Sequence, residues 1–328
     1  MKRKLTLAVT AAVTLGAVAC AIAADGPAIL DPAKAGPDYL IQGEYRGNAE
    51  NGQMVGAQVI ALGDGAFEAV FSHGGLPGNR AYDPEKRVRV QGKMEGGKAR
   101  FGTPGTGWSA TAGEKQMDGQ TDQGVKFSIK RTTRKSRTLE MKPPAGAVVL
   151  FDGTSTDAWQ NGKMTEDKLL MAGTRTKQAF GDFTLHVEFR TPWMPAARGQ
   201  ARGNSGVYVQ DRYEIQVLDS FGLAGADNEC GGIYKQSKPR VNACYPPLSW
   251  QTYDIDFEAA RFDAAGNKTK NAVITVRHNG YLIHDKLSLT SNTPGGGKNK
   301  EDATPGAIFF QDHGNPVHFR NVWIVPKG

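Results

Sequence analysis

The chain has 328 residues, with 40 Lys and Arg against 33 Asp and Glu, which gives a formal net charge of +7 at pH 7. This excess is small and no aromatic residues are interleaved with the basic ones, so the composition argues against nucleic-acid binding. The 41 glycines punctuate short apolar runs and no long segment has a helical period, which predicts an all-β protein of two domains.

The first 24 residues have the pattern of a signal peptide. Three basic residues at positions 2–4 precede an apolar run over 5–24, which contains Ala-Ile-Ala at 21–23. We therefore expect an exported protein, periplasmic or secreted, with no stable membrane span after cleavage and 37 basic residues against 33 acidic ones, a net charge of +4. The alternatives are an uncleaved anchor and a lipoprotein attached through Cys20, although the usual Leu three residues before that Cys is missing.

Residues 25–37 are rich in Pro and Ala without an apolar period, and we expect them to form a flexible start. Residues 38–131 alternate strand-like runs with turn residues, which predicts a small antiparallel β-domain, a meander or a compact barrel, of unknown role. Gly63-Asp64-Gly65 between two of these runs indicates a hairpin. The expected strands cover 39–45, 56–62, 67–71, 87–91, 99–102 and 125–130.

A linker is expected over residues 132–147. It contains Pro143-Pro144, which cannot lie inside a central strand and which restricts the residue before it. Basic residues gather around its start, where a solvated strand end explains them better than a polyanion-binding patch. They are Lys126, Lys130, Arg131, Arg134, Lys135 and Arg137.

The second domain, residues 148–328, is predicted to be a β-sandwich. Over 183–190 apolar and polar residues alternate strictly, as in strands that bury one face. Asn279-Gly280 between two runs is the strongest hairpin signal in the chain. Strands are expected at 183–190, 205–210, 213–218, 250–258, 273–278, 307–311 and 317–325.

Several segments of this domain, in order, resemble the 3-keto-disaccharide hydrolase family. They are Leu-Phe-Asp-Gly (150–153) with Trp159, Asn-Ser-Gly-Val-Tyr (204–208), Tyr-Glu-Ile-Gln-Val-Leu-Asp (213–219), Trp-Gln-Thr-Tyr-Asp-Ile (250–255), His-Asn-Gly (278–280), and Gln-Asp-His-Gly (311–314) before Phe-Arg-Asn-Val-Trp (319–323). The resemblance covers residues 148–328. It implies a concanavalin A-like sandwich, or jelly roll, and an activity on disaccharides or glycosides whose glucose unit is oxidised at C3.

Glu214, Gln216 and Asp219 are the main candidates for a catalytic groove. Residues i and i+2 of a strand share a face, and one bulge would turn residue i+5 to that face as well. The pattern is similar to the Glu-x-Asp-x-x-Glu of laminarinase-type retaining glycosidases, whose outer acids are the nucleophile and the acid/base. Here the middle Asp is Gln and the last Glu is Asp, which argues against ordinary double displacement.

A 3-keto sugar offers another route, because its carbonyl acidifies the C2 proton. A base can remove that proton, the C1 substituent can leave, and water can then add. Such a site needs a base, a donor to the enolate oxygen and an acid for the leaving oxygen. We assign Glu214 or Asp219 as the base and His313 as the acid or the enolate donor. A solvent-facing strand residue and a turn after a strand are the alternative interpretations.

Six side chains are candidates for binding the sugar. Aromatic rings can stack on a sugar ring, and amide or guanidinium groups can bind its hydroxyls. A place in the core, a turn cap or an ion pair is the structural alternative. The candidates are Gln216, Asn204, Arg190, Tyr234, Gln236 and Trp250.

Cys230 and Cys244 remain after removal of the leader, and an even pair in an exported chain predicts one disulfide. We expect the loop between them, which contains Tyr234 and Lys235, to wall the groove. Two free thiols are the alternative. No zinc spacing or EF-hand pattern is present, so we predict no metal site and no required cofactor, although Asp, Asn and Gln side chains can hold Ca²⁺.

Two functions remain open, since a fold does not decide function. The first is an exported hydrolase of 3-keto-glycosides, and the second is a non-catalytic carbohydrate-binding module. The partner is a carbohydrate in both cases. The N-terminal domain is in addition a candidate tether to the cell envelope or to another protein.

Overall fold

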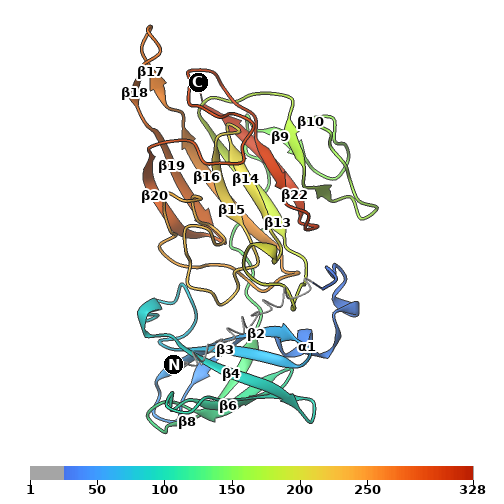
Figure 1. The fold of residues 1–328 in the computed structure, drawn as a ribbon, viewed down its shortest axis with the longest axis vertical. Helices are drawn as coiled ribbons and strands as arrows, with labels where there is room; N and C mark the ends of the chain where they lie inside the picture. Colours follow the sequence, from blue (N-terminus) through green and yellow to red (C-terminus); the bar gives the residue numbers. More distant parts are fainter. Residues whose placement is uncertain (1–25, 328) are drawn as a thin grey trace, which may run out of the picture.

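The structure, a computed structural model, describes residues 26–327. It consists of a β-barrel, blue to green in Figure 1, and a two-sheet sandwich above it. The expected signal peptide and Cys20 lie outside the described residues. The predicted fold class, a small antiparallel β-domain followed by a β-sandwich, is confirmed.

Eight antiparallel strands close the barrel. Each strand pairs with the next, and β8 returns to β1, where Thr132 pairs with Glu44. Aromatic side chains such as Phe67, Phe71 and Trp108 fill the interior, and closure leaves no free sheet edge. The strands are β1 (Gly43–Asn48), β2 (Met54–Gly63), β3 (Ala66–His73), β4 (Val88–Glu95), β5 (Lys98–Gly102), β6 (Ser109–Ala112), β7 (Gln116–Gln120) and β8 (Lys126–Thr132), with a 3₁₀ helix η2 (Pro84–Lys86) before β4.

The segment before the barrel differs from the expectation. Residues 26–41 form the 3₁₀ helix η1 (Pro32–Lys34) and the short helix α1 (Gly36–Ile41), so the strand expected from Tyr39 begins only at Gly43. Pro37 lies in the first turn of α1, where its fixed φ suits a helix. Ile29 pairs with Trp193 of the second domain, which anchors the stretch expected to be a flexible start.

The sandwich contains one sheet of seven strands and one of five. The seven-stranded sheet has the order β11-β22-β13-β16-β19-β20, with β9 also paired to β22, and the five-stranded sheet has the order β10-β12-β21-β14-β15. A 3₁₀ helix, η3 (Gly199–Ala201), precedes β14, and β17 and β18 form a separate ribbon. The strands are β9 (Val148–Phe151), β10 (Trp159–Gln160), β11 (Leu170–Met171), β12 (Thr174–Thr176), β13 (Phe183–Arg190), β14 (Ser205–Val209), β15 (Tyr213–Val217), β16 (Gln251–Glu258), β17 (Arg261–Phe262), β18 (Lys268–Lys270), β19 (Ala272–His278), β20 (Tyr281–Leu289), β21 (Phe309–Asp312) and β22 (His318–Pro326).

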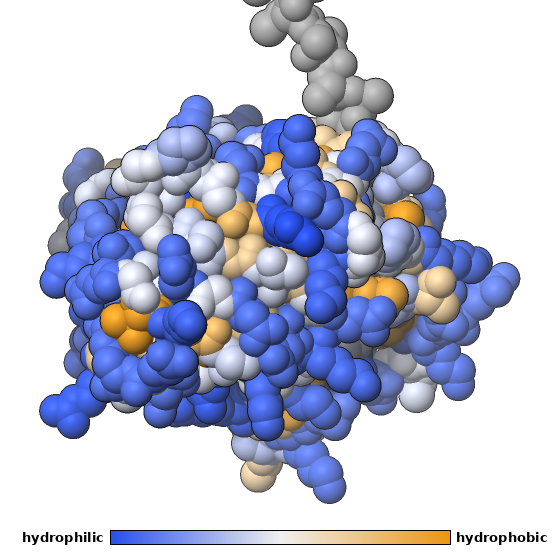
Figure 2. Space-filling model, turned by 90° about the horizontal axis from the view of Figure 1, so that it is seen from below, coloured by the Kyte–Doolittle hydropathy of each residue, from blue (hydrophilic) through white to orange (hydrophobic). Residues whose placement is uncertain are grey.

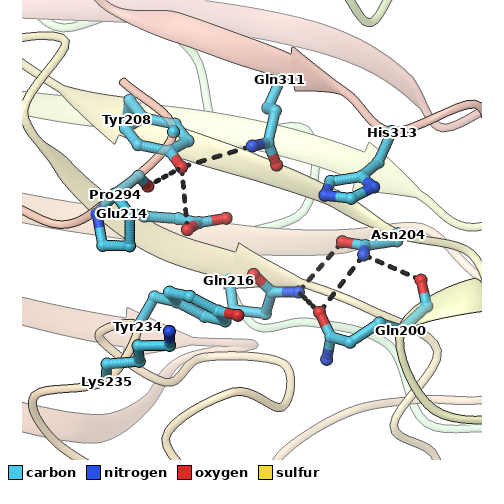
Figure 3. A pocket seen from close by; sticks show the side chains of 11 residues that line it. Gln200, Asn204, Tyr208, Glu214, Gln216, Tyr234, Lys235, Pro294, Gln311 and His313 are labelled. Carbon is cyan, nitrogen blue, oxygen red and sulfur yellow. Dashed lines mark hydrogen bonds between the residues drawn. The ribbon is translucent and has the colours of Figure 1, made fainter.

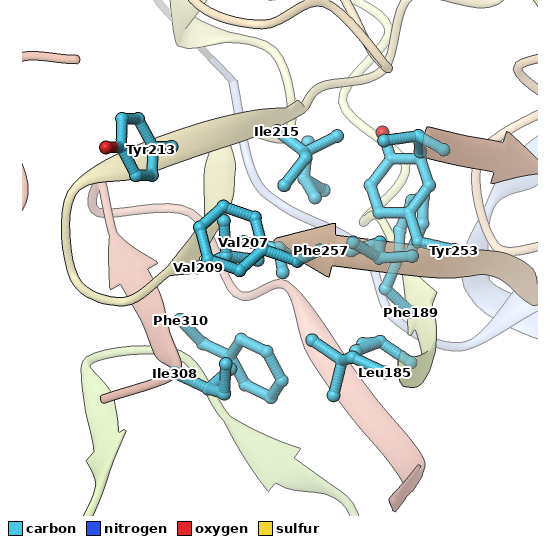
Figure 4. Packing of buried hydrophobic residues seen from close by; sticks show 14 of the residues in the cluster. Leu185, Phe189, Val207, Val209, Tyr213, Ile215, Tyr253, Phe257, Ile308 and Phe310 are labelled. Atoms are coloured by element: carbon cyan, nitrogen blue, oxygen red, sulfur yellow. The ribbon is translucent and has the colours of Figure 1, made fainter. Parts of the chain in front are cut away.

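The core of the sandwich lies between its two sheets. Leu185 and Phe189 of β13 point inward and face Val207 and Ile215 of the other sheet (Figure 4). The strict alternation of β13 leaves its polar residues on the outer face. Each sheet therefore has an outer face that carries polar side chains.

Two turns predicted from sequence form as expected. Asn279 and Gly280 have φ of 53° and 80°, and Asp64 and Gly65 have φ of 52° and 70°. Positive φ at both central residues defines the turn type whose twist matches antiparallel strands. These turns join β19 to β20 and β2 to β3.

Part of the linker covers the outer face of the seven-stranded sheet. We call residues 136–141 the strap. Ser136 and Thr138 contact Thr252 at 2.6 and 2.8 Å, and the backbone N–H of Glu140 donates to the carboxylate of Glu188. Because Glu188 is fully buried, the strap supplies a hydrogen bond that water cannot.

Guanidinium groups join the barrel to the sandwich. Arg202 donates to Asp219 at 2.7 Å and to the carbonyl of Ala61 in the barrel at 3.3 Å. Arg134 donates to Glu44 at 2.6 Å from its Nε atom and stacks on Tyr245. Ile60 and Val70 of the barrel pack with Phe221 of the sandwich. Part of the basic cluster at the linker thus serves the junction between the two domains.

The barrel end of the molecule is mainly hydrophilic, with hydrophobic residues in small separate groups (Figure 2). Exposed large hydrophobic residues of this domain include Leu40 and Met54. Among residues 26–327 there is no helix with the length and apolar character that crossing a membrane requires.

Candidate active site

A cavity of about 240 Å³ opens on the outer face of the five-stranded sheet (Figure 3). Small-molecule sites commonly measure about 300–1,000 Å³, so this cavity suits one small ligand better than a long chain. Strands β14, β15 and β21 form its floor, and loops after β15 and β20 form its walls. The lining residues are Gln200, Asn204, Tyr208, Glu214, Gln216, Tyr234, Lys235, Pro294, Gly295, Gln311 and His313.

Glu214 is the only carboxylate in this lining. It lies on β15, where Ile215 faces the core and Glu214 and Gln216 face the cavity. A Cβ atom at Gly206 on the adjacent strand would collide with the Glu214 carboxylate, so glycine makes room for it. The side chain is only 3% exposed, and this burial raises the pKa of Glu214 to about 7. The carboxyl group can therefore gain or lose a proton near neutral pH.

Tyr208 controls the surroundings of this carboxyl group. Its hydroxyl lies 2.9 Å from Glu214 Oε2 and 2.7 Å from the carbonyl oxygen of Pro294, and it accepts a hydrogen bond from Gln311. A hydroxyl has one proton to donate, so it cannot serve both acceptors at once. When Tyr208 donates to Pro294, a protonated Glu214 can donate to Tyr208; when Glu214 is ionised, Tyr208 can donate to it.

The loop that carries Pro294 is tied to the hairpin between β14 and β15. Thr293 donates to the Arg212 carbonyl from its backbone at 2.8 Å, and its hydroxyl accepts from the Glu214 backbone at 2.9 Å. Arg212 is 1% exposed and donates to the carbonyls of Lys300 and Thr304. The wall of the cavity is thereby fixed by buried groups.

Three amide side chains form the opposite end of the floor. Gln216 donates to Asn204 at 3.0 Å and to Gln200 at 3.2 Å, and Asn204 donates to the backbone carbonyl of Gln200 at 2.8 Å. Amides donate and accept at once. Such a cluster is suited to the hydroxyl groups of a neutral, polar ligand.

The loop after β15 continues the floor as an extra edge. The backbone N–H of Gln216 donates to the Gly232 carbonyl, and the backbone N–H of Tyr234 donates to the Glu214 carbonyl at 3.3 Å. This pairing places Tyr234 and Lys235 at the cavity beside Glu214. His313, directly after β21, lies exposed at the rim near Asn204.

The structure brings together five residues that the sequence singled out. They are Glu214, His313, Gln216, Asn204 and Tyr234.

Asp219 does not join them. Strand β15 ends at Val217, and the Asp219 carboxylate forms a buried ion pair with Arg202 at 2.7 Å. The expected bulge that would turn it into the groove is absent from this strand, so Asp219 has a structural position at the barrel junction.

Three predicted sugar-binding residues also lie elsewhere. Arg190 ends β13 and stacks on Trp250 at 5.1 Å in the seven-stranded sheet, whereas the cavity lies on the five-stranded one. Arg320 also stacks on Trp250, at 4.2 Å, so that ring is already covered. Gln236 donates to the carbonyl of Ser291 at 2.6 Å and joins two loops. The strand pairings, which a local pattern does not contain, separate these residues from the cavity.

The predicted disulfide is not formed. Cys230 and Cys244 are both free and buried. Their sulfur atoms bond instead to the Tyr253 hydroxyl, at 3.2 Å from Cys230, and to backbone carbonyls around Cys244. The loop between them nevertheless reaches the cavity, and its pairing with β15 rather than a covalent bridge holds it there.

Sequence reasoning missed Tyr208, Gln200 and Gln311, and it placed Lys235 on the wall of the groove without a role. A signal for Tyr208 exists, since pairing β14 with β15 across residues 210–212 puts it opposite Glu214. Gln311 reaches the cavity through the pairing of β21 with β14. No local pattern predicts that contact.

The arrangement can bind a neutral polar ligand and exchange one proton with it. No group of three or more His, Cys, Asp or Glu that could hold a metal ion occurs in residues 26–327.

The chain was compared with protein families, curated proteins and solved structures. The family model of the 3-keto-alpha-glucoside-1,2-lyase-like domain matches residues 146–325. No curated protein matches the chain. Three similar crystal structures are of proteins assigned as glycosyl hydrolases from Parabacteroides distasonis ATCC 8503.

The structure determined at 2.13 Å is 34% identical, covers 56% of this chain and 85% of its own, and has a TM-score of 0.51. Those at 1.70 and 2.00 Å are 19% and 20% identical, cover 56% and 55% of this chain and 94% and 99% of their own, and have TM-scores of 0.42 and 0.38. The family match spans more than half of the chain. The protein therefore belongs to the 3-keto-alpha-glucoside-1,2-lyase-like family.

Proposed function

We propose that the protein is an exported glycosyl hydrolase-type enzyme that cleaves 3-keto-glycosides by elimination followed by hydration. The observation that carries this proposal is a single carboxylate in the cavity with a pKa of about 7. Ordinary glycosidases use two carboxyl groups about 5–9.5 Å apart, and the described lining contains one. Elimination from a keto sugar needs one base. Membership of the 3-keto-alpha-glucoside-1,2-lyase-like family supports the same chemistry, because a lyase cleaves by elimination.

Glu214 is the proposed base. Its carboxylate takes the C2 proton, and the electrons of the C2–H bond form the C2–C3 double bond while the carbonyl oxygen becomes an enolate. The carbonyl then re-forms as a C1–C2 double bond is made and the C1–oxygen bond breaks. His313 at the rim is the proposed acid for the leaving oxygen. Water adds across the new double bond, which returns hydrogen to C2 and puts a hydroxyl on C1.

The amide cluster supports the sugar-binding part of this proposal. Asn204 and Gln216 are buried, Gln200 is exposed at the rim, and the three side chains already share hydrogen bonds. Their remaining donors and acceptors can orient sugar hydroxyls so that C2 faces Glu214. Tyr234 is half-buried at the same wall and can pack against the ring. If the protein does not cleave its ligand, the same groups would bind the sugar in a carbohydrate-binding module.

The test compares a 3-keto-glucoside with its unoxidised parent, following aglycone release by the purified protein. We expect cleavage of the keto compound alone. In D₂O, the protein should catalyse exchange of the C2 proton for deuterium, at a rate proportional to the protein concentration. Cleavage of both compounds would favour a conventional glycosidase. Saturable binding with neither cleavage nor exchange would identify a binding module.

A further inference from the structure

Lys235 is the only Lys or Arg among the described residues that line the cavity. Its ammonium lies 5.5 Å from the centre of the Tyr234 ring. Within residues 26–327 it has no carboxylate partner within ion-pair distance, unlike Arg202, which is paired with Asp219. The cavity thus holds one carboxylate, Glu214, and one cation that is not neutralised by contact.

The backbone of Lys235 is in an unfavourable conformation. Its φ is 59°, in the left-handed region where glycine is preferred and a side chain adds strain. The preceding residue is fixed by the hydrogen bond from Tyr234 to the Glu214 carbonyl. A glycine would satisfy this turn with less strain, so the turn alone does not explain a lysine there. Strained positions of this kind gather at functional sites.

The proposed reaction creates a negative charge that Glu214 cannot stabilise. When Glu214 takes the C2 proton, it becomes neutral and the charge moves to the oxygen on C3. Stabilisation of such an oxyanion by a positioned cation or donor is a large term in catalysis. The long, flexible stem of a lysine lets its ammonium move from the Tyr234 ring to a bound sugar.

We propose that Lys235 is a catalytic residue whose ammonium stabilises the enolate oxygen formed at C3. This inference rests on the proposed function. No bond forms to Lys235: its ammonium keeps its protons, and the electron pair returns from the enolate oxygen when the C1–oxygen bond breaks. The proposal gives the stabilisation of the enolate oxygen to Lys235, which lies beside the base, in addition to the rim residue His313.

The test is Lys235→Gly, which removes the amine and relieves the positive φ. We expect thermal stability equal to or above that of the parent protein. Both kcat for the 3-keto-glucoside and the rate of C2 deuterium exchange should fall about 10²–10³-fold, with KM changed much less. Lys235→Arg keeps the charge and should recover part of the exchange rate. Lys286→Gly is the matched control, since Lys286 has φ of 48° and is exposed on β20.

Three results would overturn the inference. One is deuterium exchange by Lys235→Gly at the rate of the parent. Another is an equal loss of rate in Lys286→Gly. The third is a borohydride-reducible adduct on Lys235, which would indicate a covalent imine instead. Absence of exchange and cleavage in the parent protein would refute the proposed function itself, and is therefore distinguishable.

Discussion

Glu188 and Glu214 are both buried carboxylates on the outer faces of the sandwich, yet their surroundings differ. Burial alone would raise the pKa of Glu188, but hydrogen bonds from His186, Asn321, the Glu140 backbone and Arg320 outweigh burial and lower it. Glu214 has a hydrogen bond from Tyr208 and, among residues 26–327, no cation within ion-pair distance, so burial dominates and its pKa rises to about 7.

The two faces also differ in what covers them. The strap bonds to Asp254, which is the partner of His186 at 2.6 Å, and to Glu188. Burial alone would lower the pKa of His186, but Asp254 and Glu188 outweigh it and raise it. The carboxylate at the cavity has no such cover. A buried carboxylate that is fully paired stabilises the fold, whereas one left with a single neutral donor is available for chemistry.

Replacing Glu214 by Gln should have the largest effect. Loss of the base should reduce turnover of a 3-keto-glucoside about 10²–10⁴-fold, while the fold remains intact because Gln keeps the size of the side chain. Steady-state kinetics measures turnover, and circular dichroism checks that the fold is intact. Asp219→Asn is the comparison from the same segment, expected to lower stability and to retain turnover. Comparable turnover in Glu214→Gln and the parent would remove Glu214 from the mechanism.

Replacing Glu188 by Gln should act on stability instead. It removes one of the two carboxylate partners of Arg320 and of His186, which keep Glu140 and Asp254, and breaking a buried pair costs about 3–5 kcal/mol. Urea unfolding at pH 7 measures this loss. Glu258→Gln, which breaks an exposed pair with Lys270, should cost less than about 1 kcal/mol. Equal losses in the two variants would contradict the distinction between paired and exposed carboxylates.

The pH dependence of stability should have opposite signs for the two residues. Because the pKa of Glu214 is raised, its contribution is present below its ordinary pKa of 4.5 and is lost as pH rises through about 7; the loss is about 3 kcal/mol. Because the pKa of Glu188 is lowered, its contribution is lost as pH falls through its folded value. Urea unfolding of the parent and Glu214→Gln between pH 4 and 8 should give curves that diverge toward pH 8, and parallel curves would refute this.

Replacing Tyr208 by Phe should have the smallest effect. It removes the hydrogen bond that lowers the pKa of Glu214, so the pH midpoint of kcat/KM should rise above that of the parent. Loss of the buried hydroxyl should cost about 1 kcal/mol in unfolding free energy. A pH–rate profile measures the midpoint. An unchanged or lower midpoint would show that Tyr208 does not control the base.

The strands were predictable wherever local alternation defines a buried face. Residues 183–190 form β13 with the predicted bounds, and Asn279-Gly280 forms the predicted turn. Pairing between distant strands was not predictable, because it depends on the whole sheet. Arg190 and Glu214 each lie on an outer face, but their strands belong to different sheets. Local spacing likewise could not show that Asp219 pairs with Arg202.

The strap lies outside the segment that matches the family model, although it bonds to the sandwich. The family match begins at residue 146, after the strap has ended. A fragment cut at that point would lose the hydroxyl of Thr138, which donates to Asp254 at 2.6 Å, and the backbone donor to Glu188. Buried charges would then meet water without their partners. A fragment that keeps these hydrogen bonds must begin before Ser136. The segment that matches the family model is therefore not expected to be self-sufficient when it is excised.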